Sequence, residues 1–251
     1  MARTRHARLL PTQHEIPAVA LMASSNLALN GALPQPYVVP TALASAAGML
    51  LISRLSGATP EQLGLALESA PRGVKIGLLI GVPLAVTMAA GAYIPSTQKF
   101  FRDERIMSAD GPSAFYELFI RMPVATAIGE ELIFRSALEG ILHCRRTPLQ
   151  ALITSAALFG IWHALPALDR LRSNPGARVV HKDNNLLKVV VVTGVCCATA
   201  GAGVALSWLR QMTGSVLAPI IVHYAINSGA YAGGWLASRR PNQLAIRPRT
   251  V

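Results

Sequence analysis

The chain has 251 residues, of which 52% are hydrophobic and only 14% are charged. A water-soluble domain carries about a quarter charged residues, so this composition excludes an ordinary soluble surface and indicates a protein that lies in a lipid bilayer. The formal net charge of +11 comes mainly from basic residues in the tails and in the loops between apolar stretches. That distribution fits the positive-inside rule and contact with membrane lipids better than binding of nucleic acid, which we exclude.

Apolar stretches of about membrane length recur along the chain. The first, Ile16–Leu33, is weak because Asn26 and Asn30 interrupt it. The six clear stretches that follow are Val38–Ser53, Val74–Ile94, Pro123–His143, Pro148–Leu168, Leu186–Leu209 and Ser215–Ala237. The sequence therefore predicts an all-α fold, a polytopic membrane bundle of six to seven transmembrane helices with a polar cavity inside it.

Prolines and basic residues predict helix starts and orientation. Pro123 and Pro148 each suit the first turn of a helix. Counts of Lys and Arg on alternating sides place the 96–112 loop, the 169–188 loop and the C-terminal tail in the cytosol. We therefore expect an integral protein of the cell (plasma) membrane with a cytosolic C-terminus.

Several polar side chains interrupt the apolar stretches. A charged residue at the centre of a membrane helix costs roughly 2.5–3.5 kcal/mol, so such residues are functional candidates. Glu131 and Arg135 are four residues apart in the favourable order, which predicts a structural ion pair on one helix face. Glu130 lies about 100° further round the helix and has no such cation. Glu139 is expected on the exposed or interfacial side near the helix end, and Trp162 is expected to be a packing or interfacial belt residue.

The spacing of four other polar residues predicts that they meet. Helices rise about 1.5 Å per residue, so Glu130 and His163 each lie about 20 Å from the short turn that joins their stretches. In antiparallel helices these two residues lie at one level. Asn227 lies about 18 Å beyond the start of the last stretch, with His223 one turn below it. We expect all four side chains to converge at one depth.

This set of side chains suits the activation of water. A carboxylate desolvated among apolar helices can act as a general base, and imidazoles can hold the water, donate to an oxyanion or ligate a metal. The amide of Asn227 adds a donor that can orient a substrate. Glu130, His163 and His223 could also bind Zn²⁺ or another divalent metal with an open position. The residues alone leave the metal-assisted and the metal-free chemistry both open.

Three short motifs carry a resemblance to a known family. They occur in order on separate apolar stretches, and they are Glu130-Glu131-x-x-x-Arg135, Phe159-x-x-x-His163 and His223-x-x-x-Asn227. Over about residues 120–235 they resemble the signature of the CAAX prenyl protease and bacteriocin-processing (CPBP) family of type II CAAX and Abi proteins. The resemblance divides the chain into accessory helices at 1–112, a four-helix catalytic core at 113–238 and a basic tail at 239–251.

The resemblance implies an intramembrane endopeptidase, often described as a metalloprotease, that cleaves a membrane-associated protein or peptide. Glu130 would activate the water, His163 and His223 would position it or bind a metal, and Asn227 would help to form the oxyanion site. The remaining motif residues would support these four, and they are Glu131, Arg135 and Phe159. Eukaryotic members remove three residues from prenylated CAAX proteins, and others are linked to bacteriocin maturation or immunity.

Two other functions use the same residues. A transporter or proton relay would also bury a Glu and His set in its membrane helices. A non-catalytic, immunity-type membrane adaptor could keep the fold alone. Transporters commonly carry internal repeats, and this sequence contains no obvious one.

Overall fold

The computed structural model describes residues 13–31, 33–173 and 185–240. These residues form helices and no strand, which confirms the all-α prediction. The elements, in chain order, are α1 (Glu15–Asn30), α2 (Gln35–Leu55), η1 (Leu67–Ser69), α3 (Ala70–Gly91), η2 (Gln98–Phe101), α4 (Glu104–Ser108), α5 (Gly111–Tyr116), η3 (Glu117–Ile128), α6 (Gly129–Glu131), η4 (Leu132–Leu138), α7 (Glu139–His143), α8 (Pro148–Trp162), α9 (Ala164–Ser173), α11 (Asn185–Thr213) and α12 (Leu217–Ala237).

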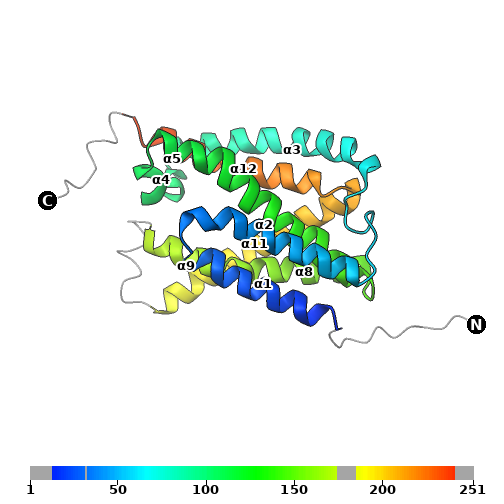
Figure 1. Cartoon of the computed structure of the whole chain (residues 1–251). Helices are drawn as coiled ribbons and strands as arrows, with labels where there is room; N and C mark the ends of the chain where they lie inside the picture. Colours follow the sequence, from blue (N-terminus) through cyan, green and yellow to red (C-terminus); the bar gives the residue numbers. More distant parts are fainter. Residues whose placement is uncertain (1–12, 32, 174–184, 241–251) are drawn as a thin grey trace, which may run out of the picture.

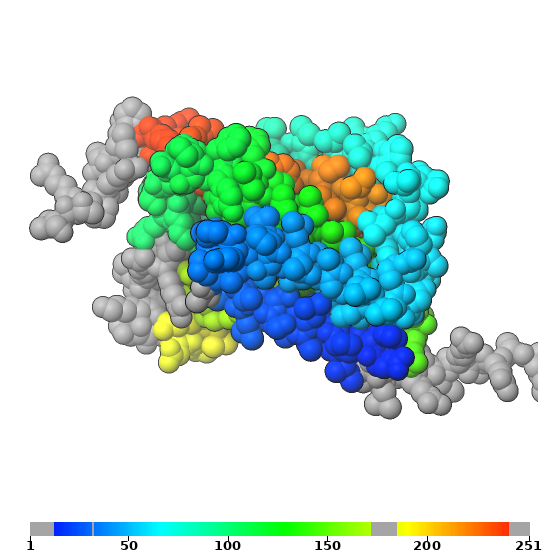
Figure 2. Space-filling model, viewed as in Figure 1, coloured from blue at the N-terminus to red at the C-terminus, as the bar shows by residue number. Residues whose placement is uncertain are grey.

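The long helices lie side by side (Figure 1). α3 packs along α12 and α8 packs along α11, while α2 packs along η3, α6 and η4 as well as along α1. α1 and α2 cover the middle of the face seen in Figure 2. The main core is formed between α1, α2, α8 and the helix that ends at His143, around the fully buried Phe134. A smaller core joins α11 to α12.

Residues 111–143 form one continuous helix, and Pro123 does not begin it. The helix starts at Gly111, and Pro123 lies inside the π-helical element η3. The predicted helix start at Pro123 is therefore wrong. A proline inside an α-helix lacks an N–H and clashes with the carbonyl four residues earlier. The wider turns of a π-helix leave more room for the ring.

The predicted stretch Pro148–Leu168 is divided at His163. α8 begins at Pro148, as predicted, with Thr147 and Gln150 forming a capping box. His163 then ends α8 with φ −82° and ψ 0°, and α9 starts at the next residue. His163 therefore lies at a helix end, where backbone carbonyls need partners from outside the helix.

Glycines allow α3 and α12 to approach closely. A Cβ atom at Gly233 would lie 2.6 Å from the backbone oxygen of Ala89, and one at Gly77 would lie 3.0 Å from the Cβ of Ile221. Small residues at such positions are typical of helix pairs in membranes. The contact joins α3, from the predicted accessory region, directly to the helix that carries His223 and Asn227.

The outer surface of the bundle is apolar. Leu79 of α3 is more than half exposed, and so are Val189 and Trp208 of α11. Among the described residues, four helical segments are long and apolar enough to cross a membrane, and they are Gln35–Leu55, Leu67–Gly91, Pro148–Leu171 and Asn185–Thr213. The structure thus supports an integral membrane protein, and the number of six to seven spans stays a prediction.

Candidate active site

The two glutamates of the first motif lie on one short α-helical turn, α6, between the π-helical elements η3 and η4. Glu131 is fully buried, and its Oε1 accepts a hydrogen bond from Nη1 of the fully buried Arg135 at 3.0 Å. This contact confirms the predicted ion pair. A buried charge is stable only when it is paired, so the pair explains how both residues can lie inside the bundle.

Glu131 also joins α12. Nδ1 of His223 lies 2.8 Å from Oε1 of Glu131, and both side chains are buried. A carboxylate can only accept, so Nδ1 of His223 carries the hydrogen and its Nε2 is the remaining ring atom that can act. The sequence did not predict that Glu131 would orient His223, because the two residues lie 92 positions apart.

The two oxygens of Glu130 have different surroundings. Its Oε1 accepts a hydrogen bond from Nε1 of Trp162 at 3.3 Å. Its Oε2 is buried and has no hydrogen-bond partner among the described residues. Because buried polar atoms are nearly always paired in folded proteins, Oε2 is the atom that a water molecule or a substrate would meet.

Trp162 is a residue whose role the sequence did not reveal. It was expected to be a packing or belt residue, and it does pack, edge-on against Phe134 at 5.5 Å between ring centroids. It is only 4% exposed, which is too buried for an interfacial belt. The indole N–H makes the contact to Glu130, and the only signal in the sequence is its position next to His163.

Phe159 fills the space between the histidines of the second and third motifs. Its ring centroid lies 4.5 Å from that of His163 and 6.1 Å from that of His223. The guanidinium of Arg135 stacks over the same ring at 3.9 Å. This packing explains why the second motif places an aromatic residue four positions before His163.

His163 is held by the end of its own helix. Its Nδ1 lies 2.8 Å from the backbone oxygen of Phe159. A carbonyl can only accept, so Nδ1 donates and Nε2 again remains as the acting atom. Asn227 lies one turn after His223 on α12, is partly buried and makes no hydrogen bond with another described residue.

The charges of this cluster act on one another. Glu130, Glu131 and Arg135 all interact electrostatically with His223. Glu130 contacts Trp162, so it lies at the level of the last turn of α8. His163 ends that helix, and the spacing had predicted that Glu130 and His163 lie at one level. The structure therefore brings the three motifs to one region of the bundle.

The residues predicted to bind a metal carry suitable atoms, since Glu130 offers Oε2 and each histidine offers Nε2. Hydrogen bonds to the other ring nitrogens are typical of metal-ligating histidines. However, no three His, Cys, Asp or Glu side chains within residues 13–31, 33–173 and 185–240 are grouped so that they could hold an ion. Binding of Zn²⁺ or another divalent metal by Glu130, His163 and His223 stays a prediction.

A second buried polar cluster lies two turns further along the same helix. Glu139 was expected at the exposed or interfacial side, but it is fully buried, so that expectation is wrong. It faces Ser207 and Arg210 of α11, and Arg210 also donates to the backbone oxygen of Gln62. The continuous helix turns this face toward α11, which sequence periodicity alone could not indicate.

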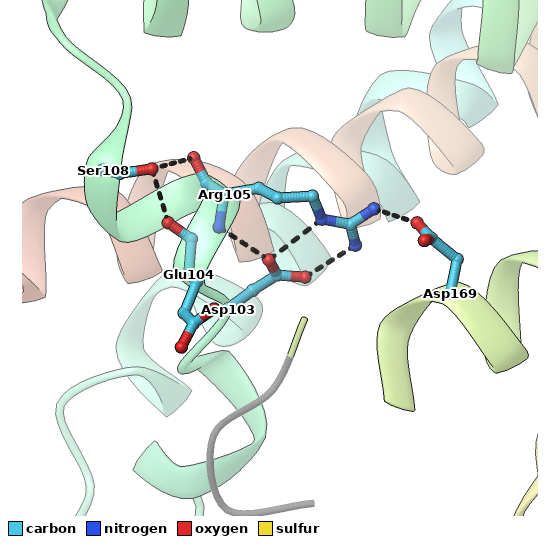
Figure 3. Close-up of polar contacts among 5 residues, drawn as sticks. All are labelled: Asp103, Glu104, Arg105, Ser108 and Asp169. Atoms are coloured by element: carbon cyan, nitrogen blue, oxygen red, sulfur yellow. Dashed lines mark hydrogen bonds and ion pairs between the residues drawn. The ribbon is translucent and has the colours of Figure 1, made fainter. Parts of the chain in front are cut away.

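A polar cluster outside the bundle core fixes α9, which follows His163. Arg105 of α4 binds Asp103 through Nε at 3.1 Å and Nη2 at 2.8 Å, and its Nη1 binds Asp169 of α9 at 2.5 Å (Figure 3). Burial raises the pKa of Asp103, but the hydrogen bonds and charge of Arg105 outweigh burial and hold that pKa below its ordinary value.

The family comparison agrees with this arrangement. Residues 112–229, a little under half of the chain, match the family described as Rce1-like: Type II CAAX prenyl endopeptidase Rce1-like. The match covers all three motifs. No curated protein and no solved structure matches the chain.

Proposed function

We propose that this chain, in which residues 112–229 are a type II CAAX prenyl endopeptidase domain of the Rce1-like family, hydrolyses a peptide bond of a membrane-associated protein or peptide by a water that Glu130 activates. The observation that carries the proposal is the asymmetry of the Glu130 carboxylate. One oxygen is held by Trp162, and the other is buried and unpaired. A general base needs such an oriented oxygen within reach of the proton that it removes.

The proposed step moves one proton and exchanges two bonds. Oε2 of Glu130 takes a proton from water while the water oxygen attacks the scissile carbonyl carbon. Nε2 of His163 and of His223 position this water, because Nδ1 of each ring is already engaged. The carbon–nitrogen bond then breaks, and the proton passes from Glu130 to the leaving amine.

The oxyanion that forms needs a donor, and Asn227 supplies it in this proposal. Its side-chain amide is not committed to another described residue. A donor placed where negative charge develops lowers the barrier without reorganisation. Glu131 and Arg135 position the site through His223, since they are buried against each other and do not need to touch the substrate.

The substrate follows from the family and the bundle. A prenylated protein or peptide would enter from the membrane or from the cytosolic side, which we propose is the side of the C-terminus. A divalent metal, when bound, would polarise the water or the carbonyl, and Glu130, His163 and His223 would be its ligands. No step above depends on it, and metal analysis of purified wild type and of His163→Ala tests this part.

The test uses an internally quenched farnesylated peptide ending in a CAAX sequence, with the full chain in proteoliposomes. Glu130→Gln should abolish cleavage while the protein keeps its thermal unfolding midpoint. Glu68→Gln, at an exposed glutamate of η1, is the matched control and should cleave as wild type does. Cleavage retained in Glu130→Gln contradicts the proposal, and ion flux without peptidase activity in wild type supports the transporter instead.

A further inference from the structure

Trp162 is fixed on three sides. Its ring packs edge-on against Phe134, its N–H donates to Oε1 of Glu130, and its backbone oxygen accepts a hydrogen bond from Nδ2 of Asn26 at 3.2 Å. Asn26 is itself held by Asn30, whose Nδ2 donates to Oδ1 of Asn26 at 2.5 Å. A chain of hydrogen bonds therefore runs from α1 to the Glu130 carboxylate.

Asn26 acts at the point where α8 ends. The last carbonyls of a helix have no partner within it, and outside groups must satisfy them. Asn26 satisfies the carbonyl of Trp162, and His163 satisfies that of Phe159. Both contacts hold the last turn of α8, which carries the indole and the imidazole of the site.

The indole is an unusual partner for a general base. It can donate a hydrogen bond but cannot accept one, so it stabilises Glu130 only as an acceptor. Hydrogen bonds to an ionised carboxylate are stronger than bonds between neutral groups. The contact therefore holds Oε1 as an acceptor and leaves Oε2 as the oxygen that can take a proton from water.

We infer that Trp162 is a positioning residue for Glu130 and that Asn26 of α1 positions Trp162. The inference rests on the proposed function for the role of Glu130, but the contacts themselves do not depend on it. It assigns a part in the site to α1, which lies outside the family match at residues 112–229. The other charged and titratable groups of the site are Glu131, Arg135, His163 and His223.

The kinetic test uses the farnesylated CAAX peptide. Trp162→Phe keeps the packing ring but removes the donor, so we expect kcat to fall about tenfold or more with KM within about twofold. Trp208→Phe, at a tryptophan of α11 that is 58% exposed, should leave kcat and KM unchanged. An unchanged kcat, a change in KM alone or an equal loss in Trp208→Phe overturns the inference.

Asn26→Ala should act in the same direction with a smaller size, about threefold in kcat, because it loses one neutral hydrogen bond. Ser24→Ala, at an exposed serine of α1, is its control. A loss in Ser24→Ala as large as that in Asn26→Ala would show a general effect on α1 and would overturn the role of Asn26.

A second measurement needs no cleavage. The chain has three tryptophans, so indole ¹⁵N–¹H spectra in lipid nanodiscs resolve them, with Trp162 assigned by its loss in Trp162→Phe. We expect its signal to be displaced in Glu130→Gln relative to wild type, because the acceptor of the indole N–H changes from a carboxylate to an amide. A Trp162 chemical shift that is the same in wild type and in Glu130→Gln overturns the inference, whatever the peptidase activity. If the Trp162 signal responds to Glu130→Gln but the wild-type protein cleaves no peptide, the contact is confirmed and the proposed function is contradicted.

Discussion

His223 and Glu131 are joined across two helices by one carboxylate oxygen, which lies 2.8 Å from Nδ1 of His223 and 3.0 Å from Nη1 of Arg135. This oxygen connects the helix of residues 111–143 to α12. The side chains of all three residues are buried, so water cannot replace a partner that is removed. The position of His223, and with it the geometry proposed for water activation, depends on a pair that need not touch the substrate.

Glu131→Ala should therefore be strongly destabilising. It leaves Arg135 buried without an opposite charge, a change that costs about 3–5 kcal/mol in proteins. Arg135→Met alone should cost a similar amount, and the double variant should be more stable than the sum of the two losses predicts. Thermal or denaturant unfolding in detergent micelles measures this, and additive losses would show that the pair is not coupled.

Glu139 offers a test of burial against the sequence-based expectation. If Glu139 faced the membrane surface, Glu139→Ala would change the free energy of unfolding by less than about 0.5 kcal/mol. Because Glu139 is fully buried, alanine would leave a cavity, so we expect a loss of more than about 1 kcal/mol and a smaller loss for the similarly sized Glu139→Gln. Glu68→Ala, at an exposed position, is the control for the unfolding measurement. Equal behaviour of the two alanine variants contradicts the burial of Glu139.

The close approach of α3 and α12 predicts intolerance at Gly233. The added Cβ of Gly233→Ala would meet the backbone of Ala89, which cannot move aside as a side chain can, so we expect a loss of about 1–3 kcal/mol. Gly201→Ala on α11 is the matched control, because a Cβ there meets nothing within 4 Å. Cleavage should fall with stability only in Gly233→Ala, since α12 carries His223. A free energy of unfolding that Gly233→Ala leaves unchanged would mean that α3 and α12 lie further apart than the contact of Gly233 with Ala89 indicates.

The contact of Asp103 with Arg105 predicts a pH dependence of stability. The pKa of Asp103 is lowered in the folded protein, so its contribution is present above the unfolded-state value, about 3.9, and is lost as pH falls through the folded value. The stability difference between wild type and Asp103→Asn should be constant from about pH 6 to 8 and should shrink below about pH 4.

Asp169→Asn is the comparison for this experiment. Asp169 is 53% exposed, so its ion pair with Arg105 should contribute less than about 1 kcal/mol. A stability difference for Asp103→Asn that grows on acidification would have the wrong sign for a stabilised carboxylate. It would show that Arg105 does not bind Asp103 in the folded protein.

The sequence by itself determined the features that depend on neighbouring positions. Two of the predicted apolar stretches lie within α2 and α11, and two others coincide with most of α3 and α12, because the cost of placing polar groups in lipid acts on each residue separately. The Glu131–Arg135 pair was predictable because residues four apart share a helix face. The family motifs are of the same kind, since each is a spacing within one helix.

Only the tertiary structure decided which helix faces meet. The contacts of His223 with Glu131, of Trp162 with Glu130 and of Asn26 with Trp162 join residues far apart in the chain. Periodicity shows that a face is polar or apolar, but not which partner it receives. Where the long helices are largely apolar, that choice rests on close packing and on the pairing of a few buried polar atoms.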